Sequence, residues 1–138
     1  MADEKTHVEV EEIKITKSFD DSFKGSMPKV MQAAIKKAVD KSKSLTTGKG
    51  ADGLLVGGTV SALTKDTKGN KTVVSAKVSL FLANSKKSIF GSASGESSTE
   101  AEDPDKPTED VKYLLQEMCR SLMEDKVVPA LEKKAAEK

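Results

Sequence analysis

The sequence predicts an α+β fold, a two-layer sandwich in which two amphipathic helices cover one face of a mostly antiparallel sheet, in the order β-α-β-β-β-α. Two observations carry this prediction. Apolar residues recur at helical spacing in one segment near residue 30 and another near residue 115, whereas elsewhere they alternate with a period of two. Two helices and a sheet that each have one apolar face can bury these faces against one another by packing as two layers. A chain of 138 residues suits one core, so we expect a single domain over 1–138.

The first predicted strand runs from Val8 to Ile15. Its apolar residues occupy even positions as far as Val10 and odd positions from Ile13 onward. Successive side chains of a strand point to opposite faces, so this change of parity predicts a β-bulge between Glu11 and Glu12.

The first helix is predicted over 27–43. Ser26 is the expected N-cap, Pro28 is tolerated in the first turn, and Gly48 and Gly50 are expected to stop the helix. The apolar stripe consists of Met27, Val30, Met31, Ala34, Ile35, Ala38 and Val39.

Three further strands are predicted to form a meander. Leu54, Val56, Val60 and Ala62 share one parity, and a turn is expected over 65–70. The second strand of this hairpin alternates strictly, with Val74, Ala76, Val78, Leu80 and Leu82 on one side. After a turn at 84–87, residues 88–95 form a weaker strand whose small side chains allow close backbone approach.

The other side of the second hairpin strand is our candidate partner-contact face. It mixes apolar and polar side chains, where a purely solvated face would be polar throughout. Its members are Val73, Ser75, Lys77, Ser79 and Phe81. The alternative is an ordinary solvated face, because scattered apolar residues are common on protein surfaces.

The C-terminal third is predicted to contain a loop, a helix and a tail. Residues 96–110 are acidic and contain two prolines, which indicates a flexible loop. Thr108 is expected to cap a helix that Pro129 kinks or ends, and 132–138 is expected to fray. The helix buries Val111, Leu114, Leu115, Met118, Cys119, Leu122 and Met123.

The composition disfavours catalysis. The chain has one His, one Cys and no Trp, and neither His7 nor Cys119 has a partner at metal-ligand or nucleophile spacing. The literal G-x-G-x-x-G at 48–53 follows a predicted helix and opens a strand, the reverse of a dinucleotide site. We therefore expect no enzyme, no cofactor, no metal site and no small-molecule substrate, and we expect Cys119 to be a buried hydrophobe.

The net charge of +1 conceals a strong pattern along the chain. Segment charges are −4 over 1–23, +10 over 24–87, −6 over 88–110 and +1 over 111–138. The basic segment contains only lysines among its cations and few aromatic residues, so nucleic acid is disfavoured as a partner. A Lys-rich protein that binds nucleic acid or another polyanion without specificity is the alternative function.

No apolar run approaches the roughly 20 residues of a membrane span. The N-terminus shows no signal peptide and no lipid-accepting Cys. As written, the chain is expected in the cytoplasm; if an export signal has been removed, it is expected in the periplasm or outside the cell.

The order of elements around the glycine-flanked strand ADGLLVGGTV (51–60) and the short strand IFGSA (89–93) resembles a group of bacterial envelope proteins. These are the small α/β domains of curli-secretion lipoproteins and of lipoprotein activators of penicillin-binding proteins. The resemblance implies a non-catalytic domain that binds another protein or copies of itself, in the cell envelope. It assigns no binding residue.

Overall fold

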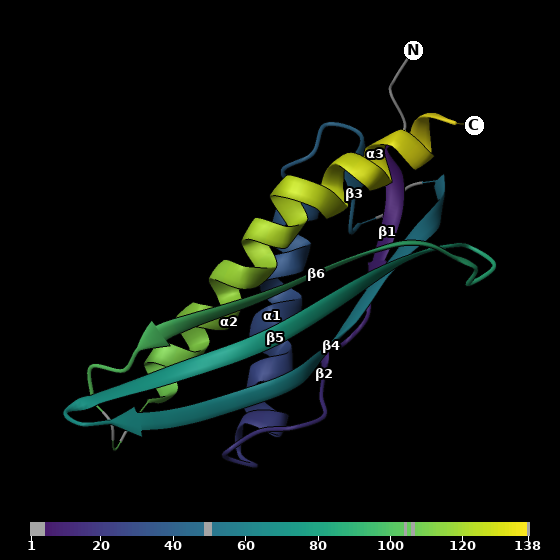
Figure 1. Cartoon of the computed structure of the whole chain (residues 1–138). Helices are drawn as coiled ribbons and strands as arrows, with labels where there is room; N and C mark the ends of the chain where they lie inside the picture. The colour runs from purple at the N-terminus through teal and green to yellow at the C-terminus, as the bar shows by residue number, and fades with distance from the viewer. Residues whose placement is uncertain (1–4, 49–50, 104, 106, 138) are drawn as a thin grey trace.

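The computed structural model describes residues 5–48, 51–103, 105 and 107–137 as one sheet with helices on one face (Figure 1). In chain order the elements are β1 (Thr6–Val10), β2 (Lys14–Ile15), α1 (Phe23–Asp40), β3 (Leu45–Thr46), β4 (Ala51–Lys68), β5 (Lys71–Asn84), β6 (Ile89–Glu100), α2 (Thr108–Leu122), the π-helical segment η1 (Met123–Val127) and α3 (Val128–Ala136). The predicted α+β class is confirmed.

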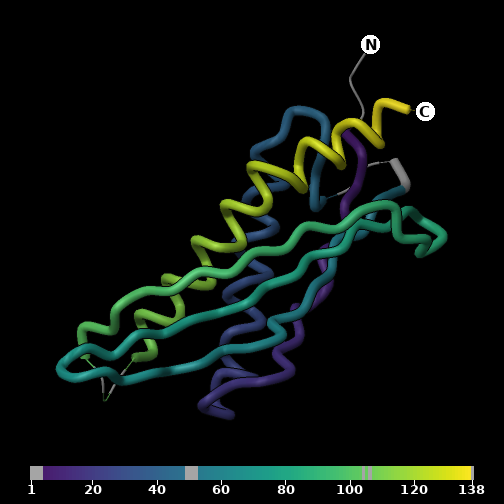
Figure 2. The backbone as a smooth tube through the Cα atoms, in the orientation of Figure 1, coloured from purple at the N-terminus to yellow at the C-terminus, as the bar shows by residue number. Residues whose placement is uncertain are grey.

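The sheet has the strand order β3-β1-β4-β5-β6, and β2 pairs with β4 beyond the end of β1. The long ladders, β4–β5 and β5–β6, are antiparallel, whereas β1 and β2 run parallel to β4. A parallel pair needs a crossover, which α1 supplies between the N-terminal strands and β4. In Figure 2 the traces of β4, β5 and β6 run side by side, with α1 and α2 on one side of them.

The predicted irregularity in the first strand is confirmed. Val10 pairs with Val56 of β4 and Lys14 pairs with Thr59. The N-terminal segment thus advances four residues where β4 advances three, so it contains one extra residue. The backbone N–H of Glu11 still donates to the carbonyl of Val56, at 2.9 Å. Because the parity changes at this irregularity, the apolar side chains before it and those after it all point into the core.

Helix α1 begins at Phe23, before the predicted start, and ends at Asp40. Ser22 occupies the N-cap position instead of Ser26. The Asp20 carboxylate accepts hydrogen bonds from the hydroxyl and the N–H of Ser22, at 2.7 and 2.9 Å, and these bonds lower the pKa of Asp20. Phe23 is buried and packs edge-to-face on Phe19, which draws this turn into the helix.

Ala62 was predicted to lie on the same side of the strand as Leu54, Val56 and Val60, and this prediction is wrong. The β4–β5 register shifts between Val60 and Ala62, so Ser61 is an extra residue and Leu63 takes the buried position. The strand also continues to Lys68, and the predicted turn over 65–70 shrinks to Gly69-Asn70, with Gly69 at φ +61°.

The prediction of an acidic loop over 96–110 is wrong for its first residues. Strand β6 continues to Glu100 and pairs with β5 along its whole length. The expected frayed tail at 132–138 is helical as far as Ala136. The Ser42 hydroxyl donates to the Glu132 carboxylate at 2.7 Å and ties α3 to the end of α1.

Pro129 has no N–H for the carbonyl of Asp125. The helix adopts the wider π-helical turn of η1 just before Pro129, where the Val128 N–H donates to the carbonyl of Met123. It then continues as α3. Leu131 remains fully buried as a result.

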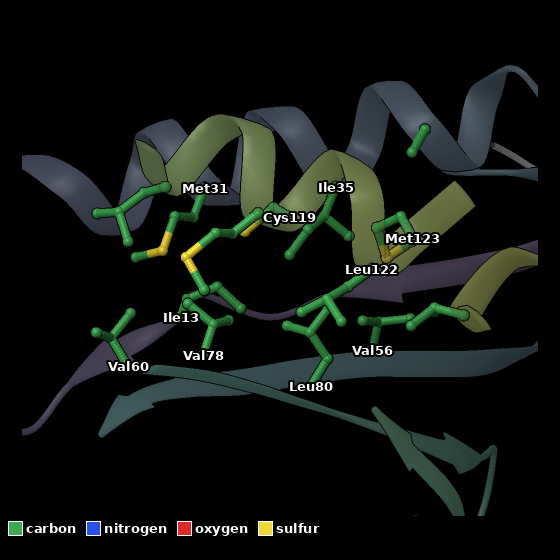
Figure 3. Packing of buried hydrophobic residues seen from close by; sticks show 14 of the residues in the cluster. Ile13, Met31, Ile35, Val56, Val60, Val78, Leu80, Cys119, Leu122 and Met123 are labelled. Carbon is green, nitrogen blue, oxygen red and sulfur yellow. The ribbon is translucent and has the colours of Figure 1, made fainter. Parts of the chain in front are cut away.

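The core lies between the sheet and the helices (Figure 3). Side chains from both layers meet there, among them Ile13, Met31, Ile35, Val56, Val60, Val78, Leu80, Cys119, Leu122 and Met123.

Candidate functional site

The five residues of the predicted contact face lie together on β5, on the side of the sheet opposite the alternating core residues. Residues directly opposite one another in a ladder share a face, so each belongs to a row of three across β4, β5 and β6. The rows are Gly57–Phe81–Ser92, Thr59–Ser79–Ser94, Ala62–Lys77–Glu96, Thr64–Ser75–Ser98 and Asp66–Val73–Glu100. We call this surface the open face.

The middle of the open face is polar. Its rows carry hydroxyl groups and an ion pair in which Lys77 Nζ lies 3.8 Å from Glu96 Oε1. A shallow hollow of about 400 Å³ lies over Thr64, Ser75 and Lys77. The two apolar members, Val73 and Phe81, are half-buried at opposite ends. The centre of the face therefore offers hydroxyls and charges to a partner, and its role in contact stays a prediction.

The edge of the sheet formed by β6 is the second candidate surface. The Ala101 N–H donates to the carbonyl of Thr72 at 2.8 Å, which fixes the alternation of the ladder with β5. Odd-numbered residues of the regular part of β6 direct their N–H and C=O groups toward β5, and even-numbered residues direct theirs away. The outward groups belong to Ser92, Ser94, Glu96 and Ser98. We call these groups the β6 edge.

Within the part of the chain that the structure describes, no other strand pairs with the β6 edge. Proteins usually protect an edge strand with Lys or Pro, or keep it short. Strand β6 has 12 residues and contains neither Lys nor Pro. With Glu96 as its one charged side chain before Glu100, the β6 edge is only weakly protected against pairing with another strand.

A groove of about 440 Å³ runs between the second half of β6 and α2. Residues 95–99 form one wall, and Tyr113, Leu114 and Met118 contribute to the other. Small side chains on β6 let the helix approach: a Cβ built on Gly95 would lie 3.7 Å from Leu122 Cδ2. Tyr113 is 62% exposed, so its ring lies open beside the β6 edge, in a groove that Glu96, Glu117 and Arg120 also line.

Charged side chains stand at both ends of β6. Lys86 and Lys87 lie in the turn before it, and Glu100, Glu102 and Asp103 lie at its end, all of them exposed. None takes part in the ion pairs found among the described residues. On α2, by contrast, Arg120 contacts two carboxylates, which raises its pKa.

His7 lies at the opposite side of the sheet, on β1. Its Nδ1 is 2.6 Å from the carbonyl oxygen of Gly48, so Nδ1 carries the proton in this contact. A hollow of about 170 Å³ beside it is lined by Glu9, Asn84 and Lys87, among others. Residues 49–50 of the G-x-G-x-x-G sequence lie outside the described residues.

Cys119 is fully buried, as predicted, and burial raises the pKa of its thiol to about 12. A thiol in this environment stays protonated and unreactive near neutral pH.

Among the described residues there is no group of three or more His, Cys, Asp or Glu side chains that could hold a metal ion. In the same residues, every helix is too short or too polar to cross a membrane.

No family model and no curated protein matches the chain. Solved structures do match. A PelC dodecamer from Paraburkholderia phytofirmans is similar with a TM-score of 0.55 and 14% identity, over 87% of this chain and 83% of that chain. A lipoprotein from Neisseria meningitidis has a TM-score of 0.52 and 10% identity, over 82% and 96% of the two chains. For a minor lipoprotein from Acinetobacter baumannii the TM-score is 0.50 and the identity 8%, over 99% and 96%.

The chain shares its fold with bacterial lipoproteins. The resemblance expected from the sequence is thus confirmed as a likeness of fold, and identities this low show nothing beyond the fold.

Sequence reasoning missed the β6 edge because it ended the strand at residue 95. The positions that face the helices beyond this point are Ser97 and Thr99, which carry no apolar signal. The available signal was the regular two-residue spacing of Ser94, Glu96 and Ser98 on the other face.

Proposed function

We propose that the protein is a non-catalytic protein-binding module of the bacterial cell envelope, which accepts a strand of another protein chain at the β6 edge. The observation that carries the proposal is the coincidence of unpaired backbone groups with a groove alongside them. The fold shared with bacterial lipoproteins supports the envelope, and the dodecamer of PelC, a protein of similar fold, supports a role in protein–protein contact.

Strand addition would use both features of this surface. Backbone hydrogen bonds to Ser92, Ser94, Glu96 and Ser98 supply affinity with little dependence on sequence. The side chains of the added strand then point alternately toward the open face and toward the helical layer. Those on the helical side reach the groove beside Tyr113, so the groove selects which strands bind well.

Site-specific photo-crosslinking in cells tests the proposal. A benzophenone amino acid is placed at Ser98 or Tyr113, beside the β6 edge, and at the exposed Ser26 on α1 as the matched control. We expect discrete crosslinked adducts from Ser98 and Tyr113 and none from Ser26. Adducts from Ser26 alone, or none from either edge position, would overturn the proposal.

A further inference from the structure

The charges that flank β6 are opposite in sign at its two ends. Lys86 and Lys87 precede the strand, while Glu100, Glu102 and Asp103 end or follow it. Between them, residues 88–95 carry no charge and Glu96 is the one charged side chain before Glu100. An edge strand with this pattern is complementary to itself, provided that the second strand runs in the opposite direction.

We infer that the β6 edge binds the β6 edge of a second copy of this chain, antiparallel and about a two-fold axis near Ser94. The inference rests on the proposed function and names its partner. In this arrangement the lysines of each copy lie beside the acidic end of the other, and the contact occurs twice because the interface is isologous. A parallel arrangement would place like charges together and is disfavoured.

The backbone fits the same arrangement. With the axis at Ser94, Ser94 faces its own copy and Ser92 faces Glu96. All three residues direct their N–H and C=O groups away from β5, so each pair exchanges two hydrogen bonds. If the register were shifted by one residue, the outward N–H and C=O groups of one copy would face residues of the other copy whose backbone groups point toward its own β5. The side chains near the axis are small, Gly91, Ala93 and Gly95 among them, and do not obstruct close approach.

Pairing of this kind joins the two sheets and keeps both helical layers on the same side. The groove beside β6 then opens toward the partner, which reduces the exposure of Tyr113. Tyr113 is the only tyrosine, and the chain has no tryptophan. Its fluorescence therefore reports on this interface without a label.

A charge exchange between the two ends of β6 tests the inference. One variant carries Lys86→Glu and Lys87→Asp, since Lys87 has φ +66° and Asp tolerates this conformation better than most residues. The other carries Glu100→Lys and Glu102→Lys. Sedimentation equilibrium measures the mass of wild type, of each variant and of an equimolar mixture, and circular dichroism checks that each variant is folded.

We expect a dimer for wild type, and dimerisation weakened about tenfold or more in each variant because like charges then meet twice. The mixture is expected to form a heterodimer, because its lysines and carboxylates again face one another at both ends. Changes in Tyr113 fluorescence should follow the same order. This recovery distinguishes the antiparallel pair from any contact that the substitutions merely damage.

Three results would overturn the inference: a wild-type monomer at millimolar concentration, variants that associate as well as wild type, or a mixture that fails to associate. The proposed function is judged separately. Crosslinked adducts from Ser98 with a mass other than that of two copies would uphold strand addition and reject the second copy as partner. Absence of any adduct from Ser98 and Tyr113 would reject both.

Discussion

The aromatic ring of Phe81 lies directly over Gly57, its partner across the β4–β5 ladder. A Cβ built on Gly57 would collide with this ring, so the glycine makes room for it. The largest side chain of the open face is therefore laid against the sheet instead of projecting from it. This relationship leaves the open face polar and makes the β6 edge the stronger candidate for protein contact.

Gly57 and its neighbour Gly58 should respond differently to alanine. In Gly57→Ala the Phe81 ring can rotate away, so we expect a loss of about 1 kcal/mol in the free energy of unfolding. In Gly58→Ala the new Cβ would lie 2.5 Å from the carbonyl oxygen of Ser79 and 2.6 Å from Leu80 Cδ2, inside the ladder and the core. We expect a loss of about 3 kcal/mol there. Urea denaturation measures both, and equal losses would contradict this account.

Proline should separate the two sides of β6. Ser94 directs its N–H away from β5, whereas Ser97 directs its N–H to β5, opposite Ala76. In thermal denaturation of dilute, monomeric protein we expect Ser94→Pro to leave the free energy of unfolding nearly unchanged and Ser97→Pro to lower it by about 1–3 kcal/mol, because Ser97→Pro leaves a ladder carbonyl unpaired. The two serines are matched controls for each other. A larger loss in Ser94→Pro would show that the alternation is assigned wrongly.

The hydrogen bond between Ser42 and Glu132 should stabilise the last helix. Ser42 is buried, and the bond joins segments distant in sequence. A double-mutant cycle with Ser42→Ala and Glu132→Ala, which removes the acceptor, is expected to give a coupling energy of about 1–2 kcal/mol. Glu137→Ala, at the end of α3, is the control and should show no coupling with Ser42→Ala. Additive losses for the first pair would mean that α3 is not held by this bond.

Cys119 should make the protein less stable in alkali. Its native pKa of about 12 lies above 9.0, the pKa of an unperturbed thiol, which is expected for the unfolded chain. Below pH 9 both states hold the proton; above it only the unfolded state releases it, so the free energy of unfolding falls by about 1.4 kcal/mol per pH unit until about pH 12. The stability difference between wild type and Cys119→Ala should therefore shift by about 2 kcal/mol in favour of the variant between pH 8 and 10.5. A constant difference would show that the thiol is not desolvated.

The regular part of the fold was predictable from the sequence because its periodicity is strong. In β5, every predicted core residue from Val74 to Leu82 is buried. The break in the first strand was also predictable, since the apolar parity changes between Val10 and Ile13. Both signals arise directly from the two-residue repeat of a strand.

The features that were missed lack such a signal. At the Ser61 bulge, Ala62 and Leu63 are both apolar, so parity could not show which one is buried. The early start of α1 depends on the packing of Phe23 against Phe19, a contact between adjacent elements. The second half of β6 is held by backbone pairing with β5. Its serine and glutamate side chains give no apolar pattern from which this pairing could be predicted.

Residue-resolved hydrogen exchange by NMR tests the β6 edge most directly, because strand addition requires the outward backbone groups of β6 to be unpaired in the monomer. In dilute protein we expect slow exchange for the amides of Ala93, Gly95 and Ser97, which pair with β5, and fast exchange for Ser92, Ser94, Glu96 and Ser98. At high concentration the outward amides near Ser94 should become protected as well. Uniform exchange along β6 in dilute protein, or outward amides that stay unprotected at every concentration while the protein associates, would contradict strand addition at this edge.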